Sequence, residues 1–249
     1  MDTLGIDLGS VSIKVVVLSG AGEARFQAWR RTQGRPFEAA AAVLREAIAA
    51  VGGDAPIGGV VVTGSGKGLL AGALRAEPVN EIVAHATAAW TMHPEVRSIV
   101  EIGGQDSKFI RIGRDADGRP FVADHAFNEL CAAGTGAFLD QMAERLGMPI
   151  EAFAAAAETA ERPARVAGRC SVFAKTDMIH LQQRACPPGE IVAGLCFALV
   201  RTYLASLCHG RAPQPPILFQ GGVAGNGGVA RAQIGRASCR ERVEISGVA

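Results

Sequence analysis

The stretch that decides the fold is TLGIDLGSVSIKVVVL, residues 3–18. Two apolar runs, 4–8 and 13–18, flank a short turn that contains glycine and serine. Apolar runs of this length on either side of a glycine turn are typical of buried β-strands. A third run at 24–31 and an alanine-rich helix at 36–51 follow. The sequence pattern of residues 3–51 therefore predicts three strands followed by a helix.

The same order of elements begins again in the second half of the chain. A strand at 59–63 and a helix at 80–92 close the first half. The second half then predicts strands at 98–102, 107–112, 120–126 and 216–220 and helices at 135–146, 150–158, 175–184 and 190–208. We therefore expect an α/β protein with mixed sheets, built as two similar lobes, 1–92 and 93–233, with a cleft between them.

Composition excludes several classes of protein. The chain has 249 residues and a formal net charge of +1, which does not favour a nucleic-acid binder. No run approaches the ~18 apolar residues of a membrane span, so no membrane association is expected. The N-terminus lacks the pattern of a secretory signal, which favours the cytoplasm. Six cysteines in a chain of this length are not a disulfide scaffold, so they are thiols, metal ligands or redox groups.

The sequence pattern changes in the last sixteen residues of the chain. The segment 234–249, IGRASCRERVEISGVA, has no clear periodicity and resembles translated adapter DNA joined to a truncated reading frame. We expect it to be a non-native tail and leave it out of the fold prediction.

Three glycine turns, each after a strand, carry the first functional signal. They are Asp7-Leu-Gly9-Ser10, Glu101-Ile-Gly103-Gly104-Gln105-Asp106-Ser107-Lys108 and Gly221-Gly222-Val-Ala. Glycine lets the backbone approach a phosphate closely, and a carboxylate beside such a turn suits Mg²⁺. A further segment, GSGKG at 64–68, lacks the spacing of a Walker A loop.

These turns resemble the phosphate-1, phosphate-2 and adenosine motifs of the acetate and sugar kinase/Hsp70/actin superfamily. The resemblance implies two ribonuclease-H-like lobes with ATP in the cleft between them. It implies phosphate contacts from Gly9, Ser10, Gly103 and Gly104. It also implies adenosine contacts from Gly221 and Gly222.

Two cysteines carry the second signal. Cys131, in NELCAAGTG, and Cys170, in GRCSVFAKTD, each lie just before a predicted helix, where anionic groups are stabilised. Their spacing matches no common zinc pattern. A cubane iron–sulfur cluster takes four thiolates, which two chains related by a two-fold axis would supply. From the chemistry alone, two buried structural cysteines are the favoured interpretation, and the shared cluster is the alternative.

The segments NELCAAGTGAFLDQMAERLG and GRCSVFAKTDMIHLQ resemble the BadF/BadG/BcrA/BcrD-type ATPases. NEIVAHATAA, at 80–89, matches the inter-lobe segment of the same family. The resemblance implies that Cys131 and Cys170 bind one 4Fe–4S cluster shared across a homodimer. It implies an ATP-dependent one-electron donor, reduced by ferredoxin or flavodoxin. Its acceptor would be a 2-hydroxyacyl-CoA dehydratase or a benzoyl-CoA-reductase-type partner.

The resemblance also assigns roles around the nucleotide, ATP or ADP. Asp7 would organise Mg²⁺, and Gln105 or Asp106 would position the attacking water. The remaining candidates for contact with the nucleotide are Lys14, Glu81 and Ser107.

Two other functions are open at this point. A small-molecule kinase of the same fold would need no cluster and would be indifferent to loss of Cys131. An ATP-gated binding module would hydrolyse ATP slowly and carry no redox colour. A truncated, inactive fragment is the third alternative, because the family continues beyond the last glycine turn with further elements.

Overall fold

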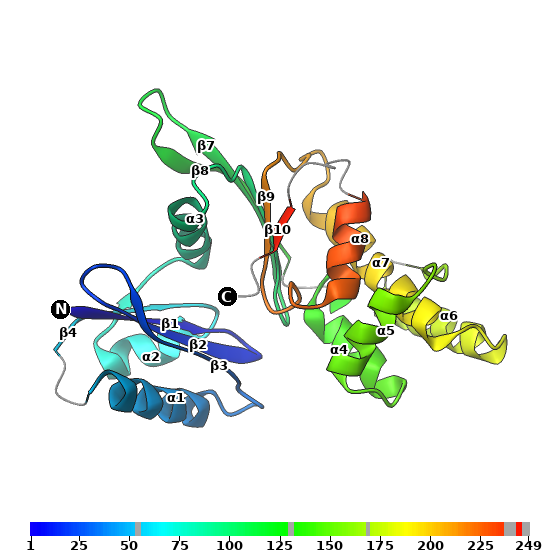
Figure 1. Cartoon of the computed structure of the whole chain (residues 1–249), viewed down its shortest axis with the longest axis horizontal. Helices are drawn as coiled ribbons and strands as arrows, with labels where there is room; N and C mark the ends of the chain where they lie inside the picture. Colours follow the sequence, from blue (N-terminus) through cyan, green and yellow to red (C-terminus); the bar gives the residue numbers. More distant parts are fainter. Residues whose placement is uncertain (53–55, 129–131, 168–169, 237–242, 246–249) are drawn as a thin grey trace. The chain divides into compact units, whose positions relative to one another are not determined.

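The computed structural model divides into two compact units, residues 1–87 and 88–249, each described by itself (Figure 1). It describes residues 1–52, 56–128, 132–167, 170–236 and 243–245. Cys131 therefore lies outside the described residues. The division falls within helix α3 (Glu81–Met92), five residues before the boundary that the sequence pattern predicts.

The first unit is a five-stranded sheet with helices. Its strands run in the order β3-β2-β1-β4-β5, and only the β1–β2 and β2–β3 pairs are antiparallel. Its elements are β1 (Asp2–Leu8), β2 (Ser12–Leu18), β3 (Ala24–Arg31), α1 (Pro36–Val51), β4 (Ile57–Thr63), α2 (Lys67–Leu74) and β5 (Glu77–Pro78), followed by the start of α3.

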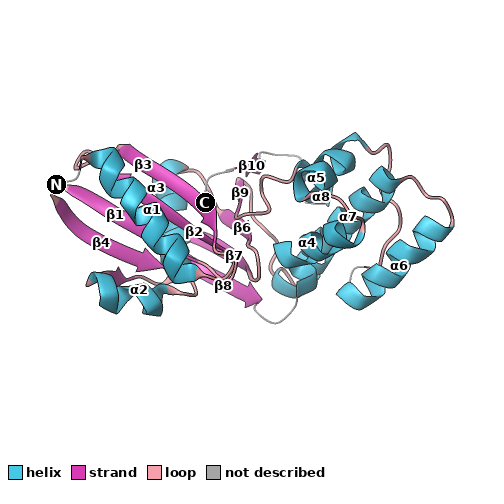
Figure 2. Cartoon of the chain, turned by 90° about the horizontal axis from the view of Figure 1, so that it is seen from below, coloured by secondary structure: helices cyan, strands magenta, loops and turns pink. Residues whose placement is uncertain are grey.

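The core of this unit follows from the period of its strands. In β2, Ile13, Val15 and Val17 are buried, because alternate side chains of a strand point to one face. Helix α1 lies along the sheet (Figure 2) and buries Val43 and Ala47 in the same core. The burial of this apolar surface holds the first glycine turn on a rigid scaffold.

The second unit also contains a five-stranded sheet, and it has more helices than the first unit. Its strands run in the order β10-β9-β6-β7-β8. Its elements are β6 (Ser98–Ile102), β7 (Ser107–Arg114), β8 (Pro120–Asn128), the 3₁₀ turn η1 (Ala132–Gly134), α4 (Gly136–Arg145), α5 (Ile150–Thr159), α6 (Ser171–Gln183), α7 (Pro188–Leu207), β9 (Ile217–Gln220), α8 (Gly227–Arg236) and β10 (Val243–Ile245).

Helix α7 is the centre of the second unit. Among the described residues it is the one helix long and apolar enough to cross a membrane, which the sequence pattern alone did not indicate. However, 61% of its most apolar window is buried inside the unit. Its side chains, such as Leu195 and Leu199, pack in the core together with Phe138, Phe153 and Phe219. Its apolar character is therefore explained by the core.

The two sheets repeat one topology. In each, the first strand pairs antiparallel with the second, the second antiparallel with the third, and the first parallel with the fourth. The last strand of each sheet pairs parallel with the fourth. The internal repetition inferred from the order of elements is thus confirmed at the level of strand pairing.

The structure contains elements that the sequence pattern did not predict. Helix α2 begins directly after the GSG turn, at the lysine of the GSGKG segment, where we expected only a turn. Helix α6 begins at Ser171, four residues earlier than expected. Helix α8 reaches into the segment 234–249, and β10, within that segment, joins the sheet beside β9. The origin of this segment stays a prediction.

Candidate functional site

The first glycine turn joins β1 to β2 and is closed by a backbone hydrogen bond from Gly9 N to Ser12 O of 2.9 Å. Ser10 is exposed at its tip, and the Thr32 hydroxyl donates to the Ser10 carbonyl at 3.2 Å. The turn is therefore also fixed by the residue that follows β3. An exposed hydroxyl and a closely approachable backbone suit a phosphate.

Asp7 and Lys14 form an ion pair behind this turn. They are directly opposite in the β1–β2 register, and Lys14 Nζ lies 2.8 Å from Asp7 Oδ2. The other carboxylate oxygen, Asp7 Oδ1, is buried and has no hydrogen-bond partner among the described residues. Lys14, expected at a phosphate, is thus engaged with a carboxylate, while Asp7 retains one unused oxygen.

The second glycine turn has the same construction. Gly103 N donates to Asp106 O at 3.0 Å, and Glu101 lies opposite Lys108 in the β6–β7 register. Lys108 Nζ lies 3.2 Å from Glu101 Oε2 and 3.0 Å from Asp106 Oδ1. Its side chain is only 1% exposed, and the centre of the Phe127 ring lies 5.1 Å from the charge. The buried lysine therefore orients two carboxylates beside the turn.

Other predicted residues of this turn have different surroundings. Gln105 is exposed at the tip. Ser107 is buried, and its hydroxyl donates to Gly134 O at 2.6 Å. The carbonyls of Gly103 and Gly104 accept the N–H groups of residues 136 and 137, at 2.8 and 2.7 Å. The turn is thereby tied to the start of α4.

The third glycine turn follows β9 and contacts the second. Gly221 has φ +95°, and a Cβ on it would lie 2.5 Å from Ile102 O and 2.6 Å from Glu101 Oε1. A residue with a side chain would collide with the end of β6, so this close approach needs glycine. Val223 N donates to Ile102 O at 3.2 Å. Within the second unit, the second and third glycine turns are therefore neighbours.

Glu81 opens helix α3 and pairs with His85 one turn later. The distance from His85 Nε2 to Glu81 Oε1 is 3.6 Å, and both side chains are more than four-fifths buried. The carboxylate is thus oriented along its own helix.

Cys170 is the residue that precedes helix α6, in extended conformation. Its side chain makes no capping hydrogen bond, and the thiol is partly exposed. A thiol at a helix N-terminus that caps nothing is free to bind another group, and the helix dipole favours an anionic one.

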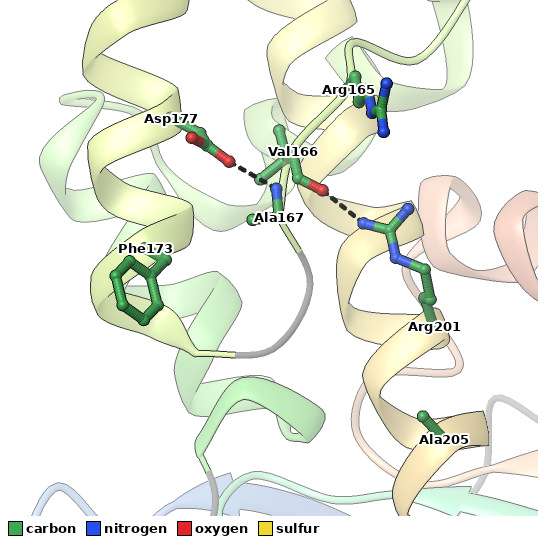
Figure 3. Close-up of a pocket in the computed structure, with 7 residues that line it drawn as sticks. All are labelled: Arg165, Val166, Ala167, Phe173, Asp177, Arg201 and Ala205. Carbon is green, nitrogen blue, oxygen red and sulfur yellow. Dashed lines mark hydrogen bonds between the residues drawn. The ribbon is translucent and has the colours of Figure 1, made fainter.

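The loop before Cys170 is fastened to two helices. Ala167 N donates to the Asp177 carboxylate of α6 at 2.6 Å. Arg201 of α7 donates to the carbonyl of Val166 (Figure 3). These contacts line a pocket of about 780 Å³ between the loop, α6 and α7. They fix residues 166 and 167 against α6 and α7 without using the Cys170 thiol.

Two other cysteines of the second unit have thiols with raised pKa values. Burial raises the pKa of the Cys196 thiol from 9.0 to about 12. Burial also raises the pKa of Cys208 from 9.0 to about 12, although Arg211 opposes the shift. Both thiols are protonated near neutral pH, whereas thiolates are the metal ligands. Buried, protonated thiols of this kind are ordinary residues of a hydrophobic core.

The comparison with protein families decides the relationship. The sequence pattern of the BadF/BadG/BcrA/BcrD ATPase family matches residues 4–246. This chain belongs to the BadF/BadG/BcrA/BcrD ATPase family. The resemblance predicted from the cysteine segments is thereby confirmed.

Three named relatives are similar to this chain over most of its length. The 2-hydroxyisocaproyl-CoA dehydratase activator of Clostridioides difficile is 32% identical over 93% of this chain and 85% of its own length. The (R)-2-hydroxyglutaryl-CoA dehydratase activating ATPase of Acidaminococcus fermentans is 28% identical over 91% of this chain and 85% of its own length. A component of the benzoyl-CoA reductase of Thauera aromatica is 27% identical over 89% of this chain and 78% of its own length.

Solved structures confirm the fold class. The activator of the 2-hydroxyisocaproyl-CoA dehydratase from Clostridium difficile with bound ADPNP has a TM-score of 0.86 and 26% identity, and the match covers 100% of this chain and 89% of the other. A ROK family glucokinase from Streptomyces griseus, with a TM-score of 0.51 and 13% identity over 98% of this chain and 93% of its own, shares only the fold. The predicted acetate and sugar kinase/Hsp70/actin fold is therefore confirmed.

Two contacts near the predicted site were not found from the sequence, the Glu101–Lys108 ion pair and the hydrogen bond to Asp177. Glu101 was quoted as part of the second turn, but its pairing with Lys108 was not foreseen. The signal was present, because acid and lysine are seven residues apart in both turns, 7–14 and 101–108. Asp177 gave no signal, because its partner is a backbone N–H ten residues away.

Proposed function

We propose that this family member is an ATP-dependent one-electron donor that activates a 2-hydroxyacyl-CoA dehydratase or a benzoyl-CoA-reductase-type partner. The observation that carries the proposal is the uncommitted Cys170 thiol at the start of α6, in a fold whose glycine turns repeat in both units. A kinase of this fold has no need for a free thiol at a helix N-terminus. The names of the relatives support the type of partner.

The nucleotide, ATP or ADP, is assigned to the three glycine turns. Gly9 and Ser10 in the first unit, and Gly103 and Gly104 in the second, would contact phosphates, and Gly221 with Gly222 would contact adenosine. The solved relative with bound ADPNP supports a nucleotide in this fold.

The residues of the first unit fit Mg²⁺. Asp7 Oδ1 is a buried carboxylate oxygen without a partner among the described residues, and such an oxygen is a ligand that Mg²⁺ accepts, directly or through water. When bound, Mg²⁺ would offset negative charge on the phosphates. Lys14 holds the other oxygen and so fixes the orientation of the carboxylate.

Water activation is assigned to the second turn. Asp106 is partly exposed and its Oδ1 is held by Lys108, while Gln105 is exposed beside it. Either side chain would orient the water that attacks the terminal phosphate. Glu101, buried against Lys108, positions the same group of side chains. The remaining assignments to the nucleotide are Ser107 and Glu81, each acting through the backbone or helix that it orients.

The 4Fe–4S cluster is assigned to Cys131 and Cys170 of two copies of the chain. The described residues include no group of three His, Cys, Asp or Glu side chains able to hold a metal. One chain supplies two cysteines in the matching motifs, and a cubane cluster takes about four thiolates. When bound, the cluster would supply the one-electron redox centre.

An apolar surface supports the second copy. Val172 and Phe173 follow soon after Cys170 on α6 and are 65% and 64% exposed. Large apolar side chains with this exposure are typical of surfaces that another protein covers. A second copy contributing its own cysteines at this place would bury them. A ferredoxin or flavodoxin in the cytoplasm is the proposed source of electrons.

Anaerobic purification tests the proposal. We expect a brown protein that hydrolyses ATP, and we expect Cys131→Ser to lose the colour while still binding nucleotide. A colourless wild-type protein that phosphorylates a sugar or a small acid, unaffected by this substitution, would identify a kinase instead. Slow ATP hydrolysis stimulated by a client protein, without colour, would identify a binding module.

A further inference from the structure

The turn after β4 lies against the first glycine turn. Ser65 Oγ is 3.2 Å from Ser10 Oγ, and Gly66 N donates to Leu8 O at 2.8 Å. Ser65 and Ser10 are both exposed. The hydroxyl expected to contact a phosphate thus has a second hydroxyl beside it, from a segment 55 residues away.

Gly64 makes this close approach possible. It has φ +88°, and a Cβ on it would lie 2.4 Å from Asp7 Oδ1 and 2.5 Å from Leu8 O. Only glycine allows the turn to lie this close to the end of β1 in that conformation. The backbone is therefore shaped around the same carboxylate oxygen that has no partner among the described residues.

The second unit repeats this arrangement. There Gly221, also at positive φ, follows the fourth strand, and a Cβ on it would collide with Glu101 and the carbonyl of Ile102. Two residues after each positive-φ glycine, an N–H donates to the strand carbonyl, Gly66 to Leu8 and Val223 to Ile102. The segment 64–66 is therefore the counterpart, in the first unit, of the turn assigned to adenosine.

The lysines of the first two turns are already engaged. Lys14 pairs with Asp7, and Lys108 with Glu101 and Asp106. Lys67 follows the GSG turn and is the first residue of α2, where the helix dipole is positive. In the part of the chain that the structure describes, no carboxylate pairs with Lys67. Two positive features, the lysine and the start of the helix, therefore lie within two residues of Ser65, an arrangement that an anion would stabilise.

We propose that Ser65 and Lys67 extend the phosphate site of the first unit and contact the terminal phosphates of the nucleotide. Ser65 donates its hydroxyl, and Lys67 supplies the positive charge that Lys14 does not. This inference rests on the proposed binding of ATP at Gly9 and Ser10, and it assigns a binding role to the GSGKG segment. It does not require the spacing of a Walker A loop.

Binding of ATP, ADP and adenosine to the anaerobically purified full chain tests the inference. Lys67→Met is expected to weaken ATP and ADP by about tenfold, the effect of losing one charge-assisted contact, and to leave adenosine unchanged. Ser65→Ala is expected to weaken ATP by about fivefold. Lys67→Arg keeps the charge and is expected to bind ATP nearly as wild type does.

Arg45→Met is the matched control, because it removes one exposed positive charge from α1 in the same unit. Unchanged affinity for ATP in Lys67→Met, or an equal loss for adenosine, would overturn the inference while leaving the proposed function intact. Wild-type protein that binds neither ATP nor ADP would instead overturn the proposed function and, with it, this inference.

Discussion

Cys170 is the residue on which the proposed redox centre depends. Its thiol makes no capping hydrogen bond, and so the substitution Cys170→Ser removes no contact that the structure shows. We expect this variant to fold normally and to lose nearly all of its iron and sulfide, because a serine hydroxyl replaces a thiolate in two of four ligand positions. Chemical analysis of iron and sulfide measures the loss.

Cys186→Ser is the control for that measurement. Cys186 is also a partly buried, free thiol, but it lies in the loop before α7. We expect its iron content to equal that of wild type. Full iron content in Cys170→Ser would show that the cluster, if present, has other ligands.

Gly64 lies so close to the end of β1, at a positive φ, that a larger residue would not fit there. We expect Gly64→Ala to destabilise the protein by about 1–3 kcal/mol, because alanine is strained at positive φ and its Cβ would meet Asp7. Gly72→Ala, in α2 with nothing within 4 Å of its Cβ, is expected to stabilise by about 0.5–1 kcal/mol. Urea unfolding of both variants distinguishes the two effects. Equal stabilities would contradict the close approach.

For single residues, the sequence predicted where the glycine turns lie, but it did not predict which side chains form ion pairs there. The three glycine turns were located, because a glycine after an apolar run is a local signal. The partners of Lys14 and Lys108 were missed, because they depend on the register of two strands. Asp7 and Glu101 lie opposite these lysines only once the hairpins are paired as the structure pairs them.

The β6–β7 hairpin contains a buried charge cluster that the β1–β2 hairpin lacks. Lys108 is 1% exposed and pairs with two carboxylates, whereas Lys14 is 18% exposed and pairs with one. We expect Lys108→Met to cost about 3–5 kcal/mol of unfolding free energy, because Glu101 is left buried without its cation. Lys14→Met is expected to cost less than Lys108→Met, because the Lys14 and Asp7 side chains are 18% and 20% exposed and Lys14 pairs with only one carboxylate.

Urea unfolding measures both costs. Replacing Glu101 by glutamine in the Lys108→Met variant is expected to recover part of the loss, because the uncompensated charge is then removed. A Lys108→Met variant as stable as Lys14→Met would show that the buried pair contributes nothing.

Helix α6, which begins directly after Cys170, is tied to residue 167 by a hydrogen bond from Ala167 N to the Asp177 carboxylate. We expect Asp177→Ala to lower iron retention, because the loop at Ala167 loses its hydrogen bond to α6. The cost in stability is expected to be only about 1 kcal/mol. Iron content after gel filtration, compared with melting temperature, separates positioning from folding. Thr176→Ala, which changes an exposed residue of the same helix, is expected to behave as wild type.

Element boundaries show why the sequence prediction was incomplete. Helix α2 was missed because glycines at 66, 68 and 72 are poor helix formers, and tertiary contacts decide its formation. The start of α6 was placed four residues late, because Val172 and Phe173 fit a strand as well as a helix.

We expect the protein to lose stability at alkaline pH, because buried acidic groups in the second unit have raised pKa values. The unfolded thiols of Cys196 and Cys208 release protons above 9.0, while burial holds their folded pKa values at about 12. Burial also raises the pKa of Tyr203 well above 10.0. The stabilisation of the folded state is therefore complete below about pH 9 and is lost as the pH rises from about 9 toward about 12.

Urea unfolding at about pH 8 and about pH 10.5 tests this dependence. We expect a lower free energy of unfolding at the higher pH, and a smaller difference between the two values in Cys196→Ala. A difference unchanged by this substitution would show that Cys196 does not carry the effect.

The repetition of two similar sheets was predictable at the scale of the molecule, because the order of elements repeats along the chain. The last strand of each sheet could not be predicted from the sequence. Strand β5 has two residues and β10 has three, which is too short for a periodic pattern. Their places are set by pairing with β4 and β9.

Native mass spectrometry of the anaerobically purified protein tests the central claim, that two chains share one cluster, most directly. The account predicts a dimer that carries about four irons and about four sulfides, and a Cys170→Ser protein without them. A wild-type monomer, or a dimer without iron that still binds ATP, would contradict the proposed redox activator.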